Sequence, residues 1–356
     1  MQPRCLSYSS VLVISWRILS TAARGGVGRL VDLSNANIVT ESSSQLFGDL
    51  LNDSRTRGGD KIARILQGID SATRPSCSDY HAPGAPMSPA CNADKCCIWS
   101  HITGEILPSF KGCTDFARGA IRQGFHDAAA WDVFSETGGA DGSLLLSDEL
   151  DRIENENIHD IGNLTKSWFK KYEDWGVSMA DLIQVSAITA TVACPGGPRI
   201  RLFVGRQDSD EANPAGLLPS PFDNADYLIS LFENKTFSST DLVALVGAHS
   251  ISKQISVDPR RIGASQGITP KVLDTTFFEN TLQGDNKTIL IIPSDAKLAA
   301  SKKTAKQWEM FAKSKATVAW NLAYARAYVR MSLLGVNNMN DMMECTKVLP
   351  PPIPTG

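Results

Sequence analysis

Apolar residues recur at helical spacing beyond the first quarter of the chain, whereas stretches that alternate like β-strands are few. The pattern predicts a mainly α-helical fold. We expect helices over 115–126, after capping signatures at Ser178 and Ser238, and over 307–334, where Gly335 supplies a stop signal. In the last of these helices the residues expected to face inward are Trp308, Phe311, Val318, Leu322, Val329 and Leu333.

The N-terminal quarter carries a weaker pattern. Arg4 precedes a moderately apolar stretch and then small residues, which is typical of a secretory signal. Glycine pairs, the string Arg57-Gly-Gly-Asp60 and a stretch rich in Pro, Ser and Ala then predict a poorly ordered leader, with one short amphipathic helix near 62–69. The expected organisation is a signal over 1–23, a leader over 24–90, a folded domain over 91–345 and a tail over 346–356.

Composition excludes two classes of partner. The chain has 356 residues, is 42% hydrophobic and carries a net charge of −3, so it lacks the basic excess that favours nucleic acid or an anionic membrane surface. No apolar run reaches the ~18–20 residues that span a bilayer. We therefore expect no nucleic acid and no membrane among the partners.

Cysteines and N-x-S/T sequons favour secretion. Of eight cysteines, Cys5 would leave with the signal, and the others lack the paired spacing of a zinc site. They suit a disulfide framework with one odd thiol, whose connectivity the spacing leaves open. Sequons occur at Asn52, Asn163, Asn234 and Asn286.

Two histidines lie in settings suited to chemistry. Arg122 and His126 are four residues apart, so they share one face of the predicted helix and can polarise and deprotonate a small ligand. His249 ends an apolar helical run, which suits a buried metal ligand. For the Arg-x-x-x-His spacing alone, the commoner interpretation is a surface arginine and a core histidine.

A glycine-rich turn follows the first of these histidines. Asp127 and the string Gly138-Gly-Ala-Asp-Gly-Ser143 present carboxylate and hydroxyl oxygens, which suit a hard cation such as Ca²⁺. A cation there would hold the end of the predicted helix. The alternative is a solvated turn, because such strings are common.

Taken together, these strings carry a family resemblance. Residues 91–345 resemble the plant-type haem peroxidase superfamily, and most of all the fungal secretory (class II) peroxidases. The resemblance implies a mainly α fold with haem b between a distal half, about 91–200, and a proximal half, about 201–345. The strings that carry it are Arg122-x-x-Phe125-His126-Asp127, Gly138-Gly-Ala-Asp-Gly-Ser143, Val204-Gly205-Arg206-x-Asp208 and Leu245-Val-Gly-Ala-His249-Ser250.

The resemblance implies roles for four distal residues. His126 is the acid–base for H₂O₂, and Arg122 is the arginine that assists it. Phe125 forms an aromatic wall, and Asn155 hydrogen-bonds His126 and keeps its free nitrogen basic.

On the proximal side, the resemblance makes His249 the ligand of the haem iron and Asp295 the carboxylate that accepts its proton. Such a partner makes an imidazole more electron-donating. Without the resemblance, Asp295 would be interpreted as an ordinary helix cap.

Two calcium sites follow from the same resemblance. Gly267 stands where the family has a proximal aspartate, so the proximal site should bind weakly or remain empty. The implied ligands are Asp127, Gly139 through its carbonyl, Asp141 and Ser143 at the distal site, and Ser250, Thr269, Val272 and Asp274 at the proximal site.

The family's disulfides can be placed in part. Lys306 stands where a further family cysteine would be, and Cys77 is expected to be free. The implied bridges are Cys113 with Cys194, Cys345 with Cys96 or Cys97, and Cys91 with the other member of that pair.

The resemblance also bears on the reducing substrate. Mn²⁺-oxidising members need three carboxylates, but here the matching positions are Asp115, Gly119 and Ile255. Members that oxidise lignin at a surface tryptophan carry it where this chain has Ala244. Both activities are therefore disfavoured, and we expect a secreted, monomeric peroxidase that uses H₂O₂ and small phenolic or aromatic donors.

Two alternatives stay open. One is a secreted haem-binding relative with weak or no catalysis. The other is an intracellular peroxidase or catalase-like relative, which would usually have tryptophan where Phe125 stands.

Overall fold

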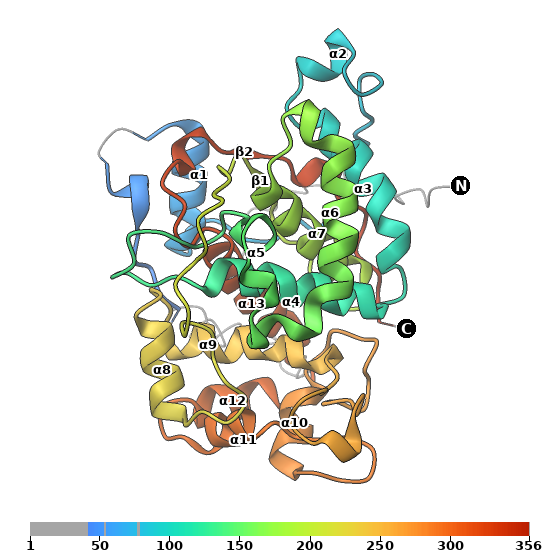
Figure 1. The fold of residues 1–356 in the computed structure, drawn as a ribbon. Helices are drawn as coiled ribbons and strands as arrows, with labels where there is room; N and C mark the ends of the chain where they lie inside the picture. Colours follow the sequence, from blue (N-terminus) through green and yellow to red (C-terminus); the bar gives the residue numbers. More distant parts are fainter. Residues whose placement is uncertain (1–41, 53–54, 77–78, 356) are drawn as a thin grey trace, which may run out of the picture.

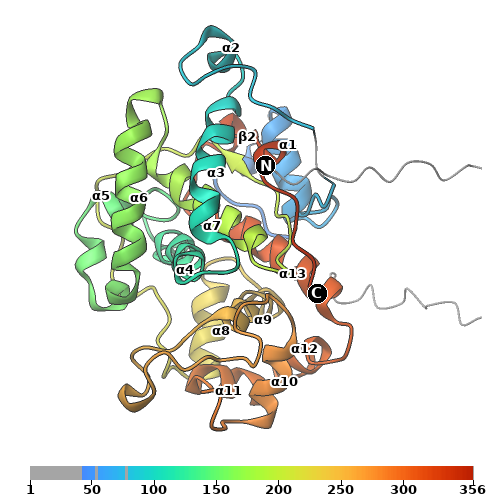
Figure 2. The same ribbon diagram turned by 90° about the vertical axis from the view of Figure 1, so that its right-hand side faces the viewer.

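The computed structural model describes residues 42–52, 55–76 and 79–355, and its helices form two groups, one above the other (Figures 1 and 2). The upper group contains α1 (Arg57–Leu66), α2 (Pro89–Asn92), α3 (Cys97–Phe110), α4 (Asp115–Ala129), α5 (Ser143–Leu146), α6 (His159–Tyr172) and α7 (Met179–Ala193). The lower group contains α8 (Ala225–Glu233), α9 (Ser239–Val246), α10 (Thr276–Gln283), α11 (Pro293–Ala300) and α12 (Ala305–Phe311). The last helix, α13 (Thr317–Met331), contacts both α4 and α9, so the chain returns to the upper group after building the lower one.

Strands contribute little, and the predicted mainly α-helical class is confirmed. Within the described residues the sheet consists of β1 (Phe203–Val204) and β2 (Met343–Glu344), which pair antiparallel. The 3₁₀ turns are η2 (Gly48–Leu51), η3 (Glu149–Asp151), η4 (Ile153–Ile158), η5 (Glu173–Trp175), η6 (Gly247–Ile251), η7 (Pro259–Arg261), η8 (Met339–Asp341) and η9 (Thr346–Val348).

Helices α4 and α7 form the centre of the upper group. Thr114 and Ser178 cap their N-termini by accepting hydrogen bonds from backbone amides in the first turn, which confirms the capping signature at Ser178. Every residue of α7 is buried, so this helix is apolar on all sides rather than amphipathic. A Cβ added at Gly124 of α4 would lie 2.7 Å from the Cβ of Ala187, so the glycine allows the two helices to approach closely.

Helix α9 begins where the sequence predicted it. Ser238 and Asp241 form a reciprocal capping box at its N-terminus. The α-helix ends at Val246, and η6 then carries His249 on a tighter turn.

The single helix expected over 307–334 is wrong. The chain forms α12 and α13 instead, separated by a polar turn in which Lys315 adopts a φ of 71°. A non-glycine residue in this left-handed region interrupts an α-helix. Val318 and Leu322, which were expected to face inward, are 73% and 42% exposed. The other four expected inward residues, Trp308, Phe311, Val329 and Leu333, are buried.

The poorly ordered leader expected over 24–90 is also wrong for its described part. Helix α1 packs against the core, with Ile62 and Leu66 fully buried. Its two glycines were interpreted as loop signals, but they are needed for close approach. A Cβ at Gly58 would lie 2.3 Å from the carbonyl oxygen of Met342, and one at Gly59 would lie 2.0 Å from the Asn340 side chain. The expected signal over 1–23 lies outside the described residues.

The tail expected after residue 345 packs against the domain over its described part. Arg199, which is buried, donates hydrogen bonds to the carbonyls of Thr346, Leu349 and Pro350. The amide of Gly196 donates to the carbonyl of Ile353 at 2.8 Å. The chain is therefore held to the fold almost to its last described residue.

The disulfide expectations are confirmed, and the open alternative is resolved. The bridges are Cys113–Cys194, Cys96–Cys345 and Cys91–Cys97. Cys77 and Cys5 lie outside the described residues.

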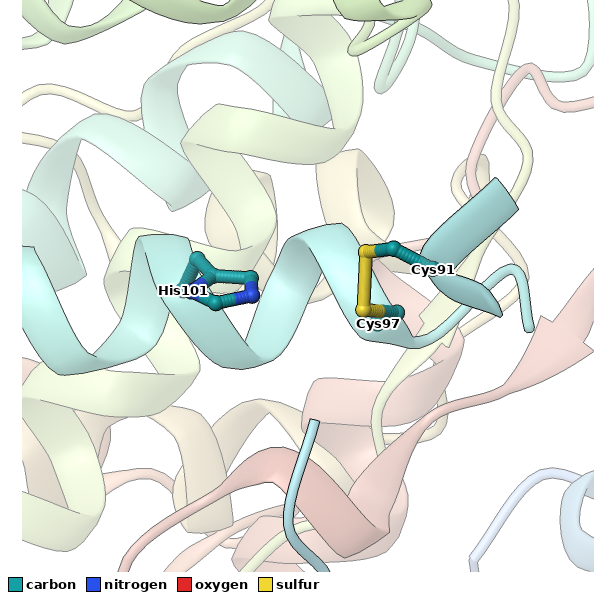
Figure 3. Close-up of side chains that lie close together, drawn as sticks. All are labelled: Cys91, Cys97 and His101. Carbon is teal, nitrogen blue, oxygen red and sulfur yellow. A yellow bond between two sulfur atoms is a disulfide. The ribbon is translucent and has the colours of Figure 1, made fainter. Parts of the chain in front are cut away.

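One disulfide has a histidine beside it. His101 lies close to the sulfurs of Cys91 and Cys97 (Figure 3), and its Nε2 is 2.9 Å from the carbonyl oxygen of Gly84. Because the two sulfurs are bonded to each other, this group is a disulfide and not a metal site. In the part of the chain that the structure describes, no helix has both the length and the hydropathy needed to cross a membrane.

Candidate active site

Both ring nitrogens of His126 have partners on the distal side. Nδ1 lies 2.6 Å from Oδ1 of Asn155, and Nε of Arg122 donates to Nε2 at 3.0 Å. The Asn155 amide nitrogen donates to the carbonyl of Glu149 at 2.7 Å, which sets the amide so that its oxygen faces the ring. His126 therefore carries its proton on Nδ1, and Nε2 has the free lone pair.

The surroundings of His126 keep it neutral. Burial, reinforced by the positive charge of Arg122, lowers the pKa of His126 to about 3, while the hydrogen bond with Asn155 acts in the opposite direction. The imidazole is buried, whereas Arg122 on the preceding turn is exposed. At neutral pH His126 is thus a proton acceptor beside a permanent positive charge.

Phe125 connects the two groups of helices. Its ring stacks on Phe232 of α8, with centroids 6.3 Å apart and planes at 10°, and it meets the edge of His126 at 5.8 Å. An aromatic wall thus lies next to the distal histidine.

On the proximal side, His249 pairs with a carboxylate. Nδ1 lies 2.9 Å from Oδ2 of Asp295, which is almost fully buried in the first turn of α11. The His249 side chain is 36% exposed, and the edge of its ring meets Phe277 at 5.9 Å. With Nδ1 directed at a carboxylate, Nε2 is the nitrogen that can bind a metal. Helix α9, which leads to His249, lies directly below α4 in both views (Figures 1 and 2).

Buried acidic groups gather at the end of α4. Asp127 is fully buried, and burial together with the charges of Asp141 and Glu149 raises its pKa well above the ordinary value. Burial also raises the pKa of Asp141 to about 6. The hydroxyl of Ser143 is buried without a hydrogen-bond partner. Carboxylates that repel one another beside an unpartnered hydroxyl fit a bound Ca²⁺, and the carbonyl of Gly139 lies in the same turn.

The expected proximal calcium residues fit a cation less well. The Ser250 hydroxyl is buried without a partner, as at the distal site. The carboxylate of Asp274, however, already accepts hydrogen bonds from the hydroxyls of Thr269 and Thr276. A Cβ at Gly267 would lie 3.1 Å from the carbonyl of Ser250, so a side chain here would point toward the same place. The fourth expected ligand, Val272, lines an adjoining surface cavity of about 780 Å³ with Thr269 and Asp274.

Asn213, which the sequence did not single out, connects the distal residues by hydrogen bonds. Its backbone amide donates to Oε1 of Glu149 at 2.8 Å, and its side-chain amide donates to the carbonyls of Asp127 and Gly139. Asn213 thus links Glu149, whose carbonyl holds Asn155, to the turn that contains Gly139. It lies 86 residues from Asp127, in a loop with no periodic pattern, so no sequence signal marked it.

Comparisons with known proteins agree with this geometry. The peroxidase family model matches residues 104–314. Ligninase LG6 of Phanerodontia chrysosporium is 30% identical over 290 residues, which cover 73% of this chain and 76% of the relative. A low-redox potential peroxidase of Taiwanofungus camphoratus is 29% identical, covering 78% and 85%. Manganese peroxidase 3 of Phlebia radiata is 29% identical, covering 67% and 72%.

The helical fold, the family match and the three disulfides thus lead to one identification. The chain belongs to the peroxidase family and is a haem peroxidase of the plant-type superfamily, similar to the fungal class II enzymes.

Proposed function

We propose that this peroxidase reduces H₂O₂ with haem b bound through His249, and that it oxidises small phenolic or aromatic donors in one-electron steps. The observation that carries the proposal is the contrast between two imidazoles. His126 is buried and neutral, with its free nitrogen beside Arg122, whereas His249 is held by the carboxylate of Asp295 with its other nitrogen available.

His249 and Asp295 fit a haem group, because an imidazole that is hydrogen-bonded to a buried carboxylate is a strong iron ligand. Haem bound there would supply the redox chemistry, passing two electrons to the peroxide and recovering them one at a time from donors. Asp295 accepts a hydrogen bond from Nδ1 of His249, which leaves Nε2, on the other side of the ring, free to bind the iron.

His126 handles the proton. Its Nε2 accepts the proton from one oxygen of H₂O₂ and returns it to the other, which leaves as water. The hydrogen bond from Arg122 occupies Nε2 in the structure, so peroxide takes the place of that contact. Arg122 then stabilises the negative charge that develops on the departing oxygen. Asn155 keeps the Nδ1 proton in place throughout.

Calcium has a supporting role in this proposal. A Ca²⁺ ion bound by Asp127, Asp141, Ser143 and the carbonyl of Gly139 would offset the repulsion among buried carboxylates directly after His126. We propose that the distal site is occupied in the working enzyme. The proximal set of Ser250, Thr269, Val272 and Asp274 would bind more weakly.

Local structure disfavours the two specialised activities. Asp115 is 79% exposed and already paired with Arg118 and Lys253, while Gly119 and Ile255 offer no further carboxylate. Two cations around one carboxylate leave little affinity for Mn²⁺. Ala244 is fully buried beneath Trp320, so a surface radical cannot form at that position. With these two activities disfavoured, we propose small phenolic or aromatic molecules as the electron donors.

Three disulfides favour an oxidising compartment, and we propose an extracellular, monomeric enzyme. This setting argues against the intracellular alternative. The catalytically weak haem-binding relative is an outcome that the next experiment distinguishes.

The test is stopped-flow absorption of the haem-reconstituted chain mixed with H₂O₂ and then with a phenol. We expect a rapid change of the Soret band and its return on adding the phenol. His126→Ala should keep the haem and slow the peroxide step by about 10²- to 10⁴-fold. His249→Ala should lose the normal haem spectrum, and His81→Ala, which alters an exposed histidine, is the matched control. A wild-type Soret band that ignores peroxide would identify a non-catalytic haem binder.

A further inference from the structure

The N-terminal segment over residues 42–52, here named the strap, contacts the helix that leads to His249. The backbone amide of Ser43 donates to Oδ2 of Asp241 at 2.8 Å. Asp241 is almost fully buried, and the same oxygen accepts from the amide and hydroxyl of Ser238 in the capping box of α9. The strap therefore binds a residue in the first turn of α9, across 198 positions of sequence.

Two buried arginines on α13 hold the strap from the other side. Arg330 donates to the carbonyls of Ser43 and Gln45, at 2.8 and 2.9 Å, and lies over the ring of Phe47. Arg326 donates to the carbonyl of Ser43 at 3.0 Å. Burying a guanidinium requires such partners, because an unpaired charge in the interior is costly.

Asp241 is the acidic group that balances these arginines. Burial lowers the pKa of Arg330 to about 10, and the charge of Asp241 acts against that change. The carbonyls of the strap accept hydrogen bonds from Arg326 and Arg330, and the carboxylate of Asp241 offsets their positive charge. Without the strap, Arg326 and Arg330 would lose their contacts with Ser43 and Gln45.

The same helix is held again just before His249. The indole nitrogen of Trp320 on α13 donates to the carbonyl of Ala244 at 3.0 Å. A Cβ at Gly247 would lie 2.3 Å from that indole nitrogen, so only glycine allows Trp320 to lie there. Helix α9 is thus fixed at its start through Asp241 and near its end through Trp320, and η6 follows with His249.

We propose that the strap is a positioning element of the peroxidase domain, and that the Ser43–Asp241 contact sets the placement of α9 and through it of His249. This inference rests on the proposed role of His249 as the iron ligand. Asp241 acts through α9, so it is a positioning residue and not a catalytic one.

The test uses Ser43→Pro in the full chain, because proline removes the amide that Asp241 accepts from. Ser44→Pro, at the next and exposed position of the strap, is the matched control. Hydrogen exchange of the haem-free proteins is measured peptide by peptide. We expect amides of α9 and η6 to exchange about tenfold faster in Ser43→Pro than in the control, while α10 and α11 are unchanged.

A second variant protects the test against misfolding. Asp241→Asn keeps the shape of the side chain but removes its charge, and it should raise exchange in the same segments. Asp241→Asn also alters the contacts with Ser238, but both changes share the Ser43–Asp241 contact, so the double variant should exchange more slowly than the two single effects multiplied together would give. After haem reconstitution, the charge-transfer absorption bands of ferric haem in both variants should differ from those of wild type.

Several results would overturn the inference. Equal exchange in Ser43→Pro and Ser44→Pro would do so, as would faster exchange spread evenly over the protein, or an unchanged absorption spectrum. If wild-type protein bound no haem, the proposed function would fail instead. The exchange result would still report whether the strap orders α9.

Discussion

The two histidines of the candidate active site are both hydrogen-bonded at Nδ1, but one partner is neutral and the other is a carboxylate. His126 is bonded through Nδ1 to the neutral amide of Asn155, and His249 is bonded through Nδ1 to the carboxylate of Asp295. The amide fixes the tautomer without adding charge, so burial and Arg122 keep His126 unprotonated. In the proposed function the carboxylate strengthens His249 as an electron donor. One residue type would thus serve two chemical purposes there, because its hydrogen-bond acceptor differs.

Giving the distal histidine a charged partner should have the largest effect. In Asn155→Asp the new carboxylate favours the imidazolium and should raise the pKa of His126, now about 3, by roughly one to three pH units. A protonated His126 cannot accept a proton from peroxide, so activity should be lost at a higher pH as the solution is acidified. For a shift of one to three pH units we expect the rate of the peroxide step at pH 4 to fall about two- to ninetyfold, and to recover toward pH 7.

Stopped-flow rates of the peroxide step between pH 3 and 8 measure this shift. Asn163→Asp, an exposed asparagine on α6, serves as the control for an added carboxylate. Identical pH profiles for wild type and Asn155→Asp would show that the partner's charge does not matter.

Removing the charge on the proximal side is the converse change. Asp295→Asn keeps an acceptor for His249 but takes away the negative charge. We expect about tenfold weaker haem retention, because groups that hydrogen-bond the metal-binding histidine contribute about 10- to 100-fold to affinity or activity. Competition for haem with an excess of apomyoglobin measures it. Retention equal to wild type would mean that the carboxylate only orients the ring.

The two proposed calcium sites extend the comparison. Chelation should lower the melting temperature of wild type by about 5–10 °C, since a ligand at a hundred times its Kd stabilises by about 2.7 kcal/mol. Asp141→Asn should abolish most of this response, and it should not destabilise the chelated protein, because a repelled carboxylate is removed. Asp274→Asn should change the response little. A larger loss in Asp274→Asn would reverse the assignment of the stronger site.

A prediction away from the two histidines concerns Lys235, which joins the two groups of helices. Its ammonium is fully buried and donates to the carbonyl of Trp131 at 2.7 Å. Burial lowers the pKa of Lys235 from 10.5 to about 8, so the folded state binds fewer protons than the unfolded state between these values. Stability should therefore rise with pH across that window.

Comparison with Lys235→Met isolates this contribution. The stability of wild type relative to the variant should increase by on the order of 3 kcal/mol between pH 7 and pH 10. Urea unfolding at a series of pH values measures the difference. A difference that stays constant with pH would show that the lysine is not desolvated.

Much of the site could be predicted because its signals are short. Arg122 and His126 are one helical turn apart, and the capping signatures at Ser178 and Ser238 lie within four residues of the helices they start. Local geometry determines such features almost independently of the rest of the chain. The contacts of Asn155 and Asp295 with the histidines followed from the resemblance, since neither lies near its histidine in sequence.

What the sequence alone determined was the helical class, the histidine pair, the acidic turn and the set of cysteines available to pair. Tertiary structure decided that α12 and α13 are separate, that Asn213 supports the distal residues, and that residues 42–52 and 55–66 belong to the domain. The physical reason is the range of the interactions. Two glycines of α1 that look like loop signals are required because the helix contacts a segment nearly three hundred residues away. Arg326 and Arg330 can be buried because carbonyls that are distant in sequence accept their hydrogen bonds.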